Sequence, residues 1–327
     1  MARGGVREST LVSLDDIRLA AGRIRTLVRR TPLLEVEVDL PGPDPRRRQT
    51  RLYLKCECFQ PGGAFKIRGA CNMIAQLPPE ARVAGVITYS SGNHGQAVAL
   101  VAEAFNAPAV IVMPETTPRV KVDGVRRHGA EVVFAGMTST DRKVRAEEIA
   151  KARGLTIVPP FDHPWIIAGQ GTTGLEILEQ HSQVRSIFVP MGGGGQIAGV
   201  SAAVKRMRSS VRIVGVEPVR AARMTASLAA GAPVALATTV SIADGLLTLR
   251  PGDITFAHVQ AFVDEVVTVS DEEIAAAMKW LFYEAKIVAE PSGAATVAAA
   301  LRVNEADTVA VVSGGNVDPD VFAGYIR

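Results

Sequence analysis

The chain has 327 residues, enough at about 150 residues per domain for two domains with a sizeable core. Hydrophobic residues make up 47% and charged residues 21%, an ordinary globular composition that argues against long disordered or coiled-coil segments. Lysine and arginine total 36 against 33 aspartate and glutamate, so the net charge is +3, far from the basic excess of nucleic-acid-binding proteins. We therefore expect no nucleic-acid partner.

Cysteine usage and the amino-terminal segment bear on the compartment. The three cysteines are an odd number without paired Cys-x-x-Cys motifs, which argues against a disulfide framework or a zinc site and fits a reducing compartment. The first 16 residues hold no apolar core of a signal peptide, and no stretch approaches about 18 uninterrupted apolar residues. We expect a cytoplasmic protein with no membrane partner. The basic run Arg46, Arg47, Arg48 and Arg51 stands beside prolines without aromatic residues, which predicts a solvated loop.

The predicted elements begin with a helix over residues 14–30, because Ser13 and Asp16 form a capping-box pattern and apolar residues then recur at helical spacing. From residue 83 onward, short apolar runs alternate with helical patterns. The expected strands are residues 83–88, 109–113, 131–134, 156–158, 186–190, 211–216 and 308–312, with further helices after Ser270 and Pro291. This alternation is typical of parallel sheets covered on both faces, so the predicted fold class is doubly wound α/β.

A glycine run follows the expected strand 186–190 and opens a helical stretch. It consists of Gly192, Gly193, Gly194 and Gly195. Backbone N–H groups and the helix dipole at such a point can bind a phosphate, and four glycines exceed what a tight turn alone requires. The run also fits a loose dinucleotide fingerprint, with Glu217 about 20 residues further on, so a nicotinamide cofactor stays open as an alternative.

A second small-residue segment follows the expected strand 83–88 and begins a helix. It contains Ser90, Ser91, Gly92, Asn93 and His94. Its free N–H groups predict an anion site, such as one for a carboxylate. A histidine at a helix start is equally often a packing residue, so His94 carries weight only together with its neighbours.

Lys66 and Ser313 indicate which kind of cofactor these glycine-rich strand ends would bind. Lys66 stands among apolar and small residues at a predicted helix start, where burial and the helix dipole lower a lysine pKa. Only a neutral amine attacks a carbonyl, although a surface lysine would also explain the residue alone. Ser313 ends strand 308–312, where a hydroxyl can meet a ring nitrogen. Together these features indicate a pyridoxal phosphate pocket better than a dinucleotide cleft.

Six motifs, in this order and at this spacing, closely resemble the fold-type II pyridoxal phosphate enzymes, whose fold is like that of the tryptophan synthase β subunit. They are residues 65–70, 90–96, 168–172, 192–199, 290–293 and 313–316. Within that group the chain is most similar to the threonine/serine dehydratase and serine racemase family, from about Leu14 to the carboxyl terminus. The resemblance implies two doubly wound α/β domains with the cofactor between them, a large one of residues 1–82 and 165–327 and a small one of 83–164. It also implies a homodimer.

The resemblance further implies a role for each site residue. Lys66 would bind pyridoxal 5'-phosphate through a Schiff base, Phe65 would pack against the ring, Asn93 would bind the ring hydroxyl and Ser313 the pyridine nitrogen. Gly192, Gly193, Gly194 and Gly195 would bind the phosphate. Ser90, Ser91, Gly92, Asn93 and His94 would receive the carboxylate of a small amino-acid substrate.

The reaction implied by the resemblance is loss of water from L-threonine or L-serine, giving a 2-oxo acid and ammonia. Dehydratases commonly read Ser-Ala-Gly-Asn-His where this chain has Ser91 as the second residue, as serine racemases do. Ser91 could therefore act as a second acid/base opposite Lys66, and a serine racemase or a 3-hydroxyaspartate dehydratase stays open as an alternative.

One departure concerns the cation site of many relatives, where the glutamate corresponding to Glu217 is followed six residues later by an acid. Here that position is Arg223, and a guanidinium would replace or repel a divalent ion, so we expect no metal. Two distant alternatives remain. A nicotinamide oxidoreductase would leave Lys66 and Ser313 unexplained, and a non-catalytic binding protein would not need the lysine.

Overall fold

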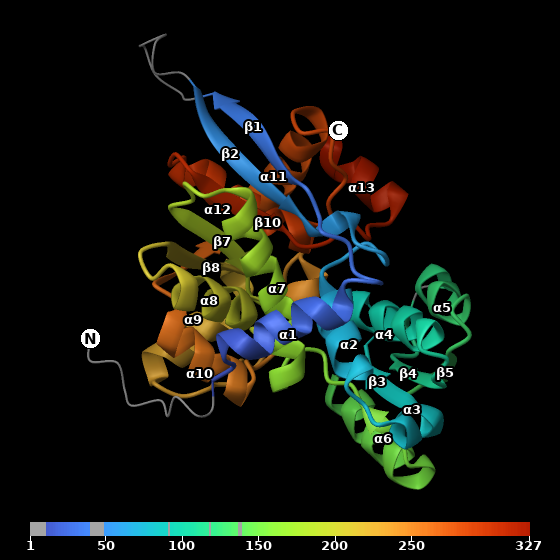
Figure 1. Ribbon diagram of the computed structural model, residues 1–327. Coiled ribbons are helices and arrows are strands. Elements are labelled where there is room, and N and C mark those ends of the chain that lie inside the picture. The colour runs from blue at the N-terminus through green and yellow to red at the C-terminus, as the bar shows by residue number, and fades with distance from the viewer. Residues whose placement is uncertain (1–10, 40–48, 91, 118, 137–138) are drawn as a thin grey trace.

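The computed structural model describes residues 11–39, 49–90, 92–117, 119–136 and 139–327. Within them the chain forms a six-stranded sheet, in the order β1-β2-β10-β7-β8-β9, and a four-stranded sheet, in the order β5-β4-β3-β6. Helices cover both sheets, and the two layered units form the two lobes of Figure 1. The strands are β1 Leu33–Asp39, β2 Gln49–Cys56, β3 Val86–Tyr89, β4 Ala109–Met113, β5 Glu131–Phe134, β6 Thr156–Ile157, β7 Ser186–Pro190, β8 Arg212–Pro218, β9 Glu265–Val269 and β10 Thr308–Val312.

The helices follow the α/β alternation that the sequence predicts. They are α1 Leu14–Ile24, α2 Lys66–Ala75, α3 Pro79–Ala84, α4 Asn93–Ala104, α5 Arg119–Arg126, α6 Ser139–Arg153, α7 Pro164–Gln180, α8 Gly195–Met207, α9 Arg223–Ala230, α10 Asp253–Phe262, α11 Asp271–Tyr283, α12 Pro291–Val303 and α13 Pro319–Ile326, with short 3₁₀ turns η2 Glu57–Phe59, η3 Val219–Ala221 and η4 Asp244–Leu246. The capping box predicted at Ser13 is present, and the helix expected after Ser270 begins with a second one, between Ser270 and Glu273. The α/β fold class is confirmed.

The larger sheet is parallel except at one edge. Its central strands β7 and β10 are buried at every position, as expected of apolar runs covered on both faces. At the edge, β1 and β2 pair antiparallel, with Leu33 opposite Lys55. The sequence analysis missed this hairpin and β9, so the sheet is mixed where purely parallel strands were expected. The alternation Val36-Glu37-Val38 in β1 is the period-two pattern that predicts a half-buried strand.

The smaller sheet is parallel throughout, and its four strands lie between residues 86 and 157. The boundaries 83 and 164 themselves stay a prediction. Helix α2 packs on both sides of the junction, because Ile67 and Ile74 share an apolar cluster with Val98 of α4. On α7, Gly169 lies so close to the Arg68 carbonyl that a Cβ there would be 2.5 Å from the oxygen. Helix α2, which begins at Lys66, is thus held between the two lobes.

Two predicted boundaries were wrong. The first helix ends at Ile24 and not near residue 30, because the N–H groups of Leu27 and Val28 both donate to the Ile24 carbonyl and close a turn. Residues 83–84 belong to α3 and not to β3. Gly85 separates the two elements with a φ of 108°, and a Cβ there would lie 2.7 Å from the Pro108 carbonyl oxygen.

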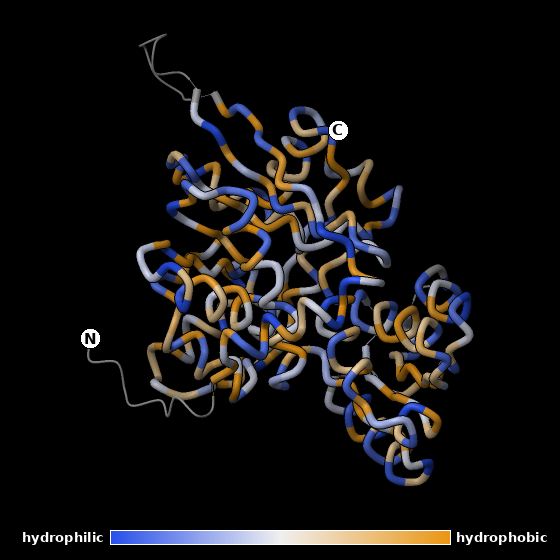
Figure 2. Tube along the Cα trace, viewed as in Figure 1, coloured by the Kyte–Doolittle hydropathy of each residue, from blue (hydrophilic) through white to orange (hydrophobic). Residues whose placement is uncertain are grey.

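Among the described residues, no helix is long and apolar enough to cross a membrane. Figure 2 shows the same property, because hydrophobic and hydrophilic stretches alternate over short distances along the whole trace. Of the basic run, Arg46, Arg47 and Arg48 lie outside the described residues. Arg51 lies in strand β2 and not in a loop, because it pairs with β1, and its guanidinium lies 3.1 Å from the Glu35 carboxylate.

Candidate active site

The predicted site residues come together where parallel strands end. The Phe65 N–H donates to the Ser313 carbonyl over 3.0 Å, which joins the start of α2 to the end of β10. The side chain of Asn93, at the start of α4, reaches the opposite lobe and donates to Glu290 Oε1 over 2.7 Å. Carboxyl ends of parallel strands form the usual ligand crevice of α/β proteins, and this one lies between the two sheets.

Lys66 presents its amine at the segment that crosses from one sheet to the other. Its Nζ donates to the Pro160 carbonyl over 2.7 Å and lies 5.1 Å from the centroid of the Phe65 ring. Burial lowers the pKa of Lys66 to about 8, against an opposing effect of the Glu290 charge. The amine is therefore neutral in part near physiological pH, which confirms the direction expected from its sequence environment.

Two carbonyls of the glycine loop accept hydrogen bonds from neighbouring elements. Arg223 Nη1 donates to the Gly192 carbonyl over 3.1 Å, and Thr255 Oγ1 donates to the Gly193 carbonyl over 2.6 Å. Within the described part of the chain, the N–H groups of residues 192–197 donate no hydrogen bond. Six free donors at the positive end of α8 form a cradle for a phosphate group.

Close packing explains why the loop needs glycines. A Cβ at Gly193 would lie 2.4 Å from the ring of Phe161, and Gly194 has a φ of 97°. Phe161 stands just after Pro160, so the crossing segment supports both the loop and the Lys66 amine. From the sequence, only a domain boundary after residue 164 was expected near this crossing, and its contacts depend on tertiary structure that no local pattern shows.

The segment 90–94 begins helix α4 as predicted. Gly92 is the residue before the helix, and its N–H donates to Ser90 Oγ over 3.3 Å. Burial and the charge of Lys66 lower the pKa of His94 to about 3, although a hydrogen bond to the Val158 carbonyl opposes this shift, so the imidazole is neutral. Ser91 lies outside the described residues.

Ser313 follows β10 with a buried hydroxyl. Its Oγ donates to the Ser292 carbonyl over a long 3.4 Å, so the hydroxyl keeps hydrogen-bonding capacity for a bound group. Its own carbonyl accepts the Phe65 N–H, which places Ser313 beside the start of α2.

The carboxyl of Glu217 is occupied by the protein itself. It accepts hydrogen bonds from the Met224 N–H, the Thr225 N–H and Thr225 Oγ1, over 2.9, 3.0 and 2.9 Å, at the start of α9. The guanidinium of Arg223 lies 3.8 Å away and donates to the carbonyls of Met191 and Leu246. Glu217 is fully buried and cannot bind a ribose, which argues against the nicotinamide alternative. Among the described residues, no cluster of three or more His, Cys, Asp or Glu is placed to hold a metal ion.

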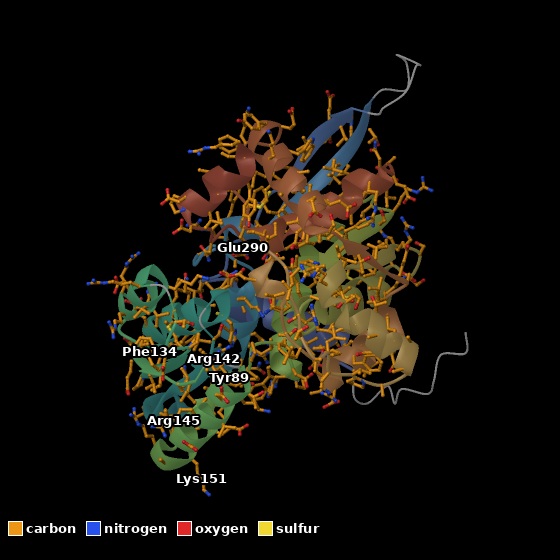
Figure 3. All side chains as sticks on the ribbon, turned by 180° about the vertical axis from the view of Figure 1, so that it is seen from behind. Tyr89, Phe134, Arg142, Arg145, Lys151 and Glu290 are labelled. Atoms are coloured by element: carbon orange, nitrogen blue, oxygen red, sulfur yellow. The ribbon has the colours of Figure 1, made fainter. Side chains whose placement is uncertain are left out.

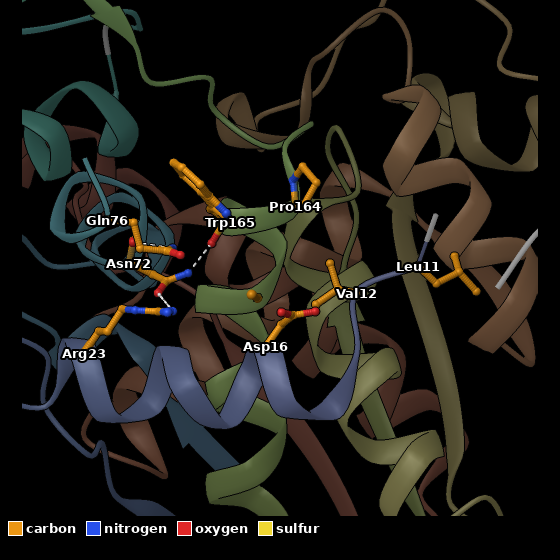
Figure 4. A pocket seen from close by; sticks show the side chains of 9 residues that line it. Leu11, Val12, Asp16, Arg23, Asn72, Gln76, Pro164 and Trp165 are labelled. Carbon is orange, nitrogen blue, oxygen red and sulfur yellow. Dashed lines mark hydrogen bonds between the residues drawn. The ribbon is translucent and has the colours of Figure 1, made fainter. Parts of the chain in front are cut away.

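A different pocket lies between α1, α2 and α7 (Figure 4). It is lined by Asp16, Arg23, Asn72, Gln76 and Trp165, among others, and Asn72 Nδ2 donates to the Trp165 carbonyl over 2.7 Å. None of its lining residues is a predicted site residue, and the side chains of Arg23, Asn72 and Gln76 take part in hydrogen bonds within the lining.

These features fit pyridoxal phosphate: free N–H donors for the phosphate, an amine of lowered pKa for the aldehyde and a hydroxyl for the ring nitrogen. The sequence matches the family described as pyridoxal-phosphate dependent enzyme over residues 24–314. The chain belongs to this family, its cofactor is pyridoxal phosphate, and the nicotinamide alternative is wrong.

Similar proteins of known name indicate to which members of this family the chain is related. The L-threonine ammonia-lyase of Thermotoga maritima is 42% identical over 322 residues, which cover 97% of this chain and 79% of that protein. The L-threo-3-hydroxyaspartate ammonia-lyase of Saccharomyces cerevisiae is 39% identical over 315 residues, 95% of each chain. The structure of maize serine racemase matches with a TM-score of 0.88 at 38% identity and covers 96% of each chain. The predicted fold-type II resemblance is confirmed.

Proposed function

We propose that the protein is an ammonia-lyase that removes water from L-threonine or L-serine and releases a 2-oxo acid and ammonia. The observation that carries this proposal is the partly buried Lys66 amine, with its lowered pKa, beside six free N–H donors and a neutral Ser313 hydroxyl. The ammonia-lyase names of two relatives point to the same reaction class.

Each residue has a place in this proposal. The N–H groups of residues 192–197 bind the phosphate, Phe65 packs against the ring, Asn93 binds the ring hydroxyl and Ser313 faces the pyridine nitrogen. When bound, pyridoxal phosphate supplies an electron sink that makes the Cα–H bond of an amino acid acidic. A serine hydroxyl cannot hold a proton on the ring nitrogen as an acid does, which favours early loss of the β-substituent.

The chain's own groups then move protons and exclude water. The start of α4, with Ser90, Gly92 and His94, receives the substrate carboxylate, because its N–H groups and dipole favour an anion. The neutral amine of Lys66 accepts the Cα proton, and the β-hydroxyl leaves as water after it gains a proton. The released enamine hydrolyses to the 2-oxo acid and ammonia in solution.

The test is a substrate panel on the purified protein, with detection of 2-oxo acid and ammonia. L-Threonine and L-serine should be turned over, and Lys66→Ala should lose both the turnover and the visible absorbance of the cofactor. If the protein shows the cofactor absorbance but forms no 2-oxo acid from any β-hydroxy amino acid, the proposal is contradicted. A non-catalytic binding protein would give this result.

A second candidate, a serine racemase or a 3-hydroxyaspartate ammonia-lyase, is favoured by the serine at position 91 and by the names of the relatives. In this candidate Ser91 acts as a second acid/base on the face opposite Lys66. Chiral analysis of serine recovered from L-serine, with the wild type and with Ser91→Ala, separates the two. If the wild type forms D-serine from L-serine and Ser91→Ala does not, the result supports the racemase.

We propose as well that the protein is a cytoplasmic homodimer in which residues 83–164 move as a small domain that closes over the substrate. The cross-lobe ion pair between Lys121 of α5 and Asp244 of η4, at 3.3 Å, is a contact that such closure would use. Light scattering should give twice the 34.6 kDa of one chain.

A further inference from the structure

Glu290 is a buried carboxyl in the site to which the mechanism above gives no role. It stands directly before α12, and its own N–H donates to the Gly314 carbonyl over 3.1 Å. A Cβ at Gly314 would lie 2.4 Å from Glu290 Oε1, so the carboxyl packs against the backbone next to Ser313. Figure 3 shows Glu290 where the two lobes meet. The carboxyl thus contacts Asn93 and the residue next to Ser313, and both Asn93 and Ser313 are expected to bind polar atoms of the cofactor ring.

A relay of hydrogen bonds determines how the Asn93 amide is oriented. Asn93 Nδ2 donates to Glu290 Oε1 over 2.7 Å, and Asn316 Nδ2 donates to Asn93 Oδ1 over 2.9 Å. Asn316 Nδ2 in turn donates to the Gly62 carbonyl over 2.7 Å. The Gly62 carbonyl fixes the Asn316 NH₂, so a reversed Asn93 amide would bring its own NH₂ against that NH₂. The relay therefore permits one orientation.

In this orientation Asn93 keeps a free donor. Glu290 accepts one of its two N–H hydrogens and Asn316 donates to its oxygen, so the second N–H hydrogen is left for a ligand. We propose that Glu290 is a positioning residue that, through Asn93, holds a hydrogen-bond donor toward the ring oxygen of pyridoxal phosphate and so favours the deprotonated form of that oxygen. The inference rests on the proposed function, because it uses the placement of the ring hydroxyl at Asn93.

The charge of Glu290 depends on several neighbours. Burial raises the pKa of Glu290 to about 8, and the negative charge of Asp244 on η4 acts in the same direction. Lys121 on α5, together with the hydrogen bonds from Asn93 and Asn316, opposes the shift. Lys66 on α2 also feels the charge of Glu290. An ionised carboxylate is the stronger acceptor, so Asn93 is held most firmly above pH 8.

The experiment measures the holoprotein's visible absorbance between pH 6 and 10, together with the dissociation constant of pyridoxal phosphate from the reconstituted apoprotein. In the wild type, the fraction of cofactor with a deprotonated ring oxygen, which absorbs at longer wavelength, should rise with a midpoint near pH 8. Glu290→Gln keeps an acceptor but cannot ionise, so this rise should disappear. Glu290→Ala should favour the short-wavelength form and weaken cofactor binding about tenfold, the loss of one charge-assisted hydrogen bond.

Two controls separate positioning from a structural role. Asp244→Asn removes a neighbouring charge outside the relay and should move the midpoint to lower pH without abolishing it. In an Asn93→Ala background, Glu290→Ala should have no further effect on the absorbance ratio. The inference is overturned if both Glu290 variants keep the wild-type ratio and pH profile, or if the two substitutions act additively. Failure of the proposed function would show separately, as a holoprotein that has the cofactor absorbance but forms no 2-oxo acid from L-threonine or L-serine.

Discussion

Replacing Arg68 with methionine is expected to destabilise the helix that carries Lys66 without touching the site itself. Arg68 is fully buried and makes paired hydrogen bonds of 2.7 and 2.8 Å to Glu57 and again to Glu176. Lys55 completes the cluster with a bond of 2.6 Å to Glu176, so two cations face two carboxylates. Burial alone would raise the pKa of Glu57, but the charge and hydrogen bonds of Arg68 outweigh it and lower that pKa.

Arg68→Met leaves Glu57 buried without its cation, and breaking a buried pair costs about 3–5 kcal/mol. With an unfolding entropy of about 2.1 cal/mol/K per residue, a chain of this length has about 0.7 kcal/mol/K, so Tm should fall by about 4–7 °C. Scanning calorimetry of the holoprotein at pH 7 measures the change. The double variant Arg68→Met with Glu57→Leu keeps Lys55 paired with Glu176 and should recover at least half of the loss. A double variant no more stable than the single one would refute the reasoning.

Three further predictions concern the site. Gly193→Ala should weaken pyridoxal phosphate binding by about tenfold or more, because its Cβ would lie 2.4 Å from the Phe161 ring. Adding Phe161→Ala should restore part of the lost affinity. An unchanged dissociation constant in equilibrium dialysis would contradict this prediction. The rate at which the apoprotein binds the cofactor covalently should rise with pH around a midpoint near 8, since burial lowers the pKa of Lys66 to about 8 and only the neutral amine reacts. Stopped-flow absorbance measures this rate, and a midpoint near pH 10 would contradict the prediction. EDTA should leave turnover largely intact, because Arg223 and the Thr225 N–H already face Glu217, and a strong Mg²⁺ requirement would count against that arrangement.

The local sequence was sufficient to predict an element or a site residue where the residues that surround it are its neighbours along the chain. The apolar runs of β4, β5, β7 and β10 were predicted to the residue. The start of α4 followed from small residues after a strand, and the start of α2 from the small and apolar residues around Lys66. The lowered pKa of Lys66 was expected for the same reason. The edge hairpin β1–β2 carried a usable alternating pattern and was overlooked.

The remainder depends on groups far apart in the chain. Nothing near Lys66 in sequence indicates that the Pro160 carbonyl, 94 residues away, accepts its hydrogen bond. The carboxyl of Glu290 and the amide of Asn93 are 197 residues apart and meet only because their helices start at the same crevice. Glu217 was considered for a ribose, yet the turn into α9 brings its carboxyl onto N–H groups seven and eight residues further on.

The hydrogen bond from Lys66 to the Pro160 carbonyl exists only while the amine is free. If Nζ were bonded to the cofactor aldehyde, it would no longer offer the same hydrogens to Pro160. The segment between β6 and α7 would then lose one hydrogen bond to α2. Backbone amides of residues 158–163 should therefore exchange with solvent faster in the holoprotein than in the apoprotein.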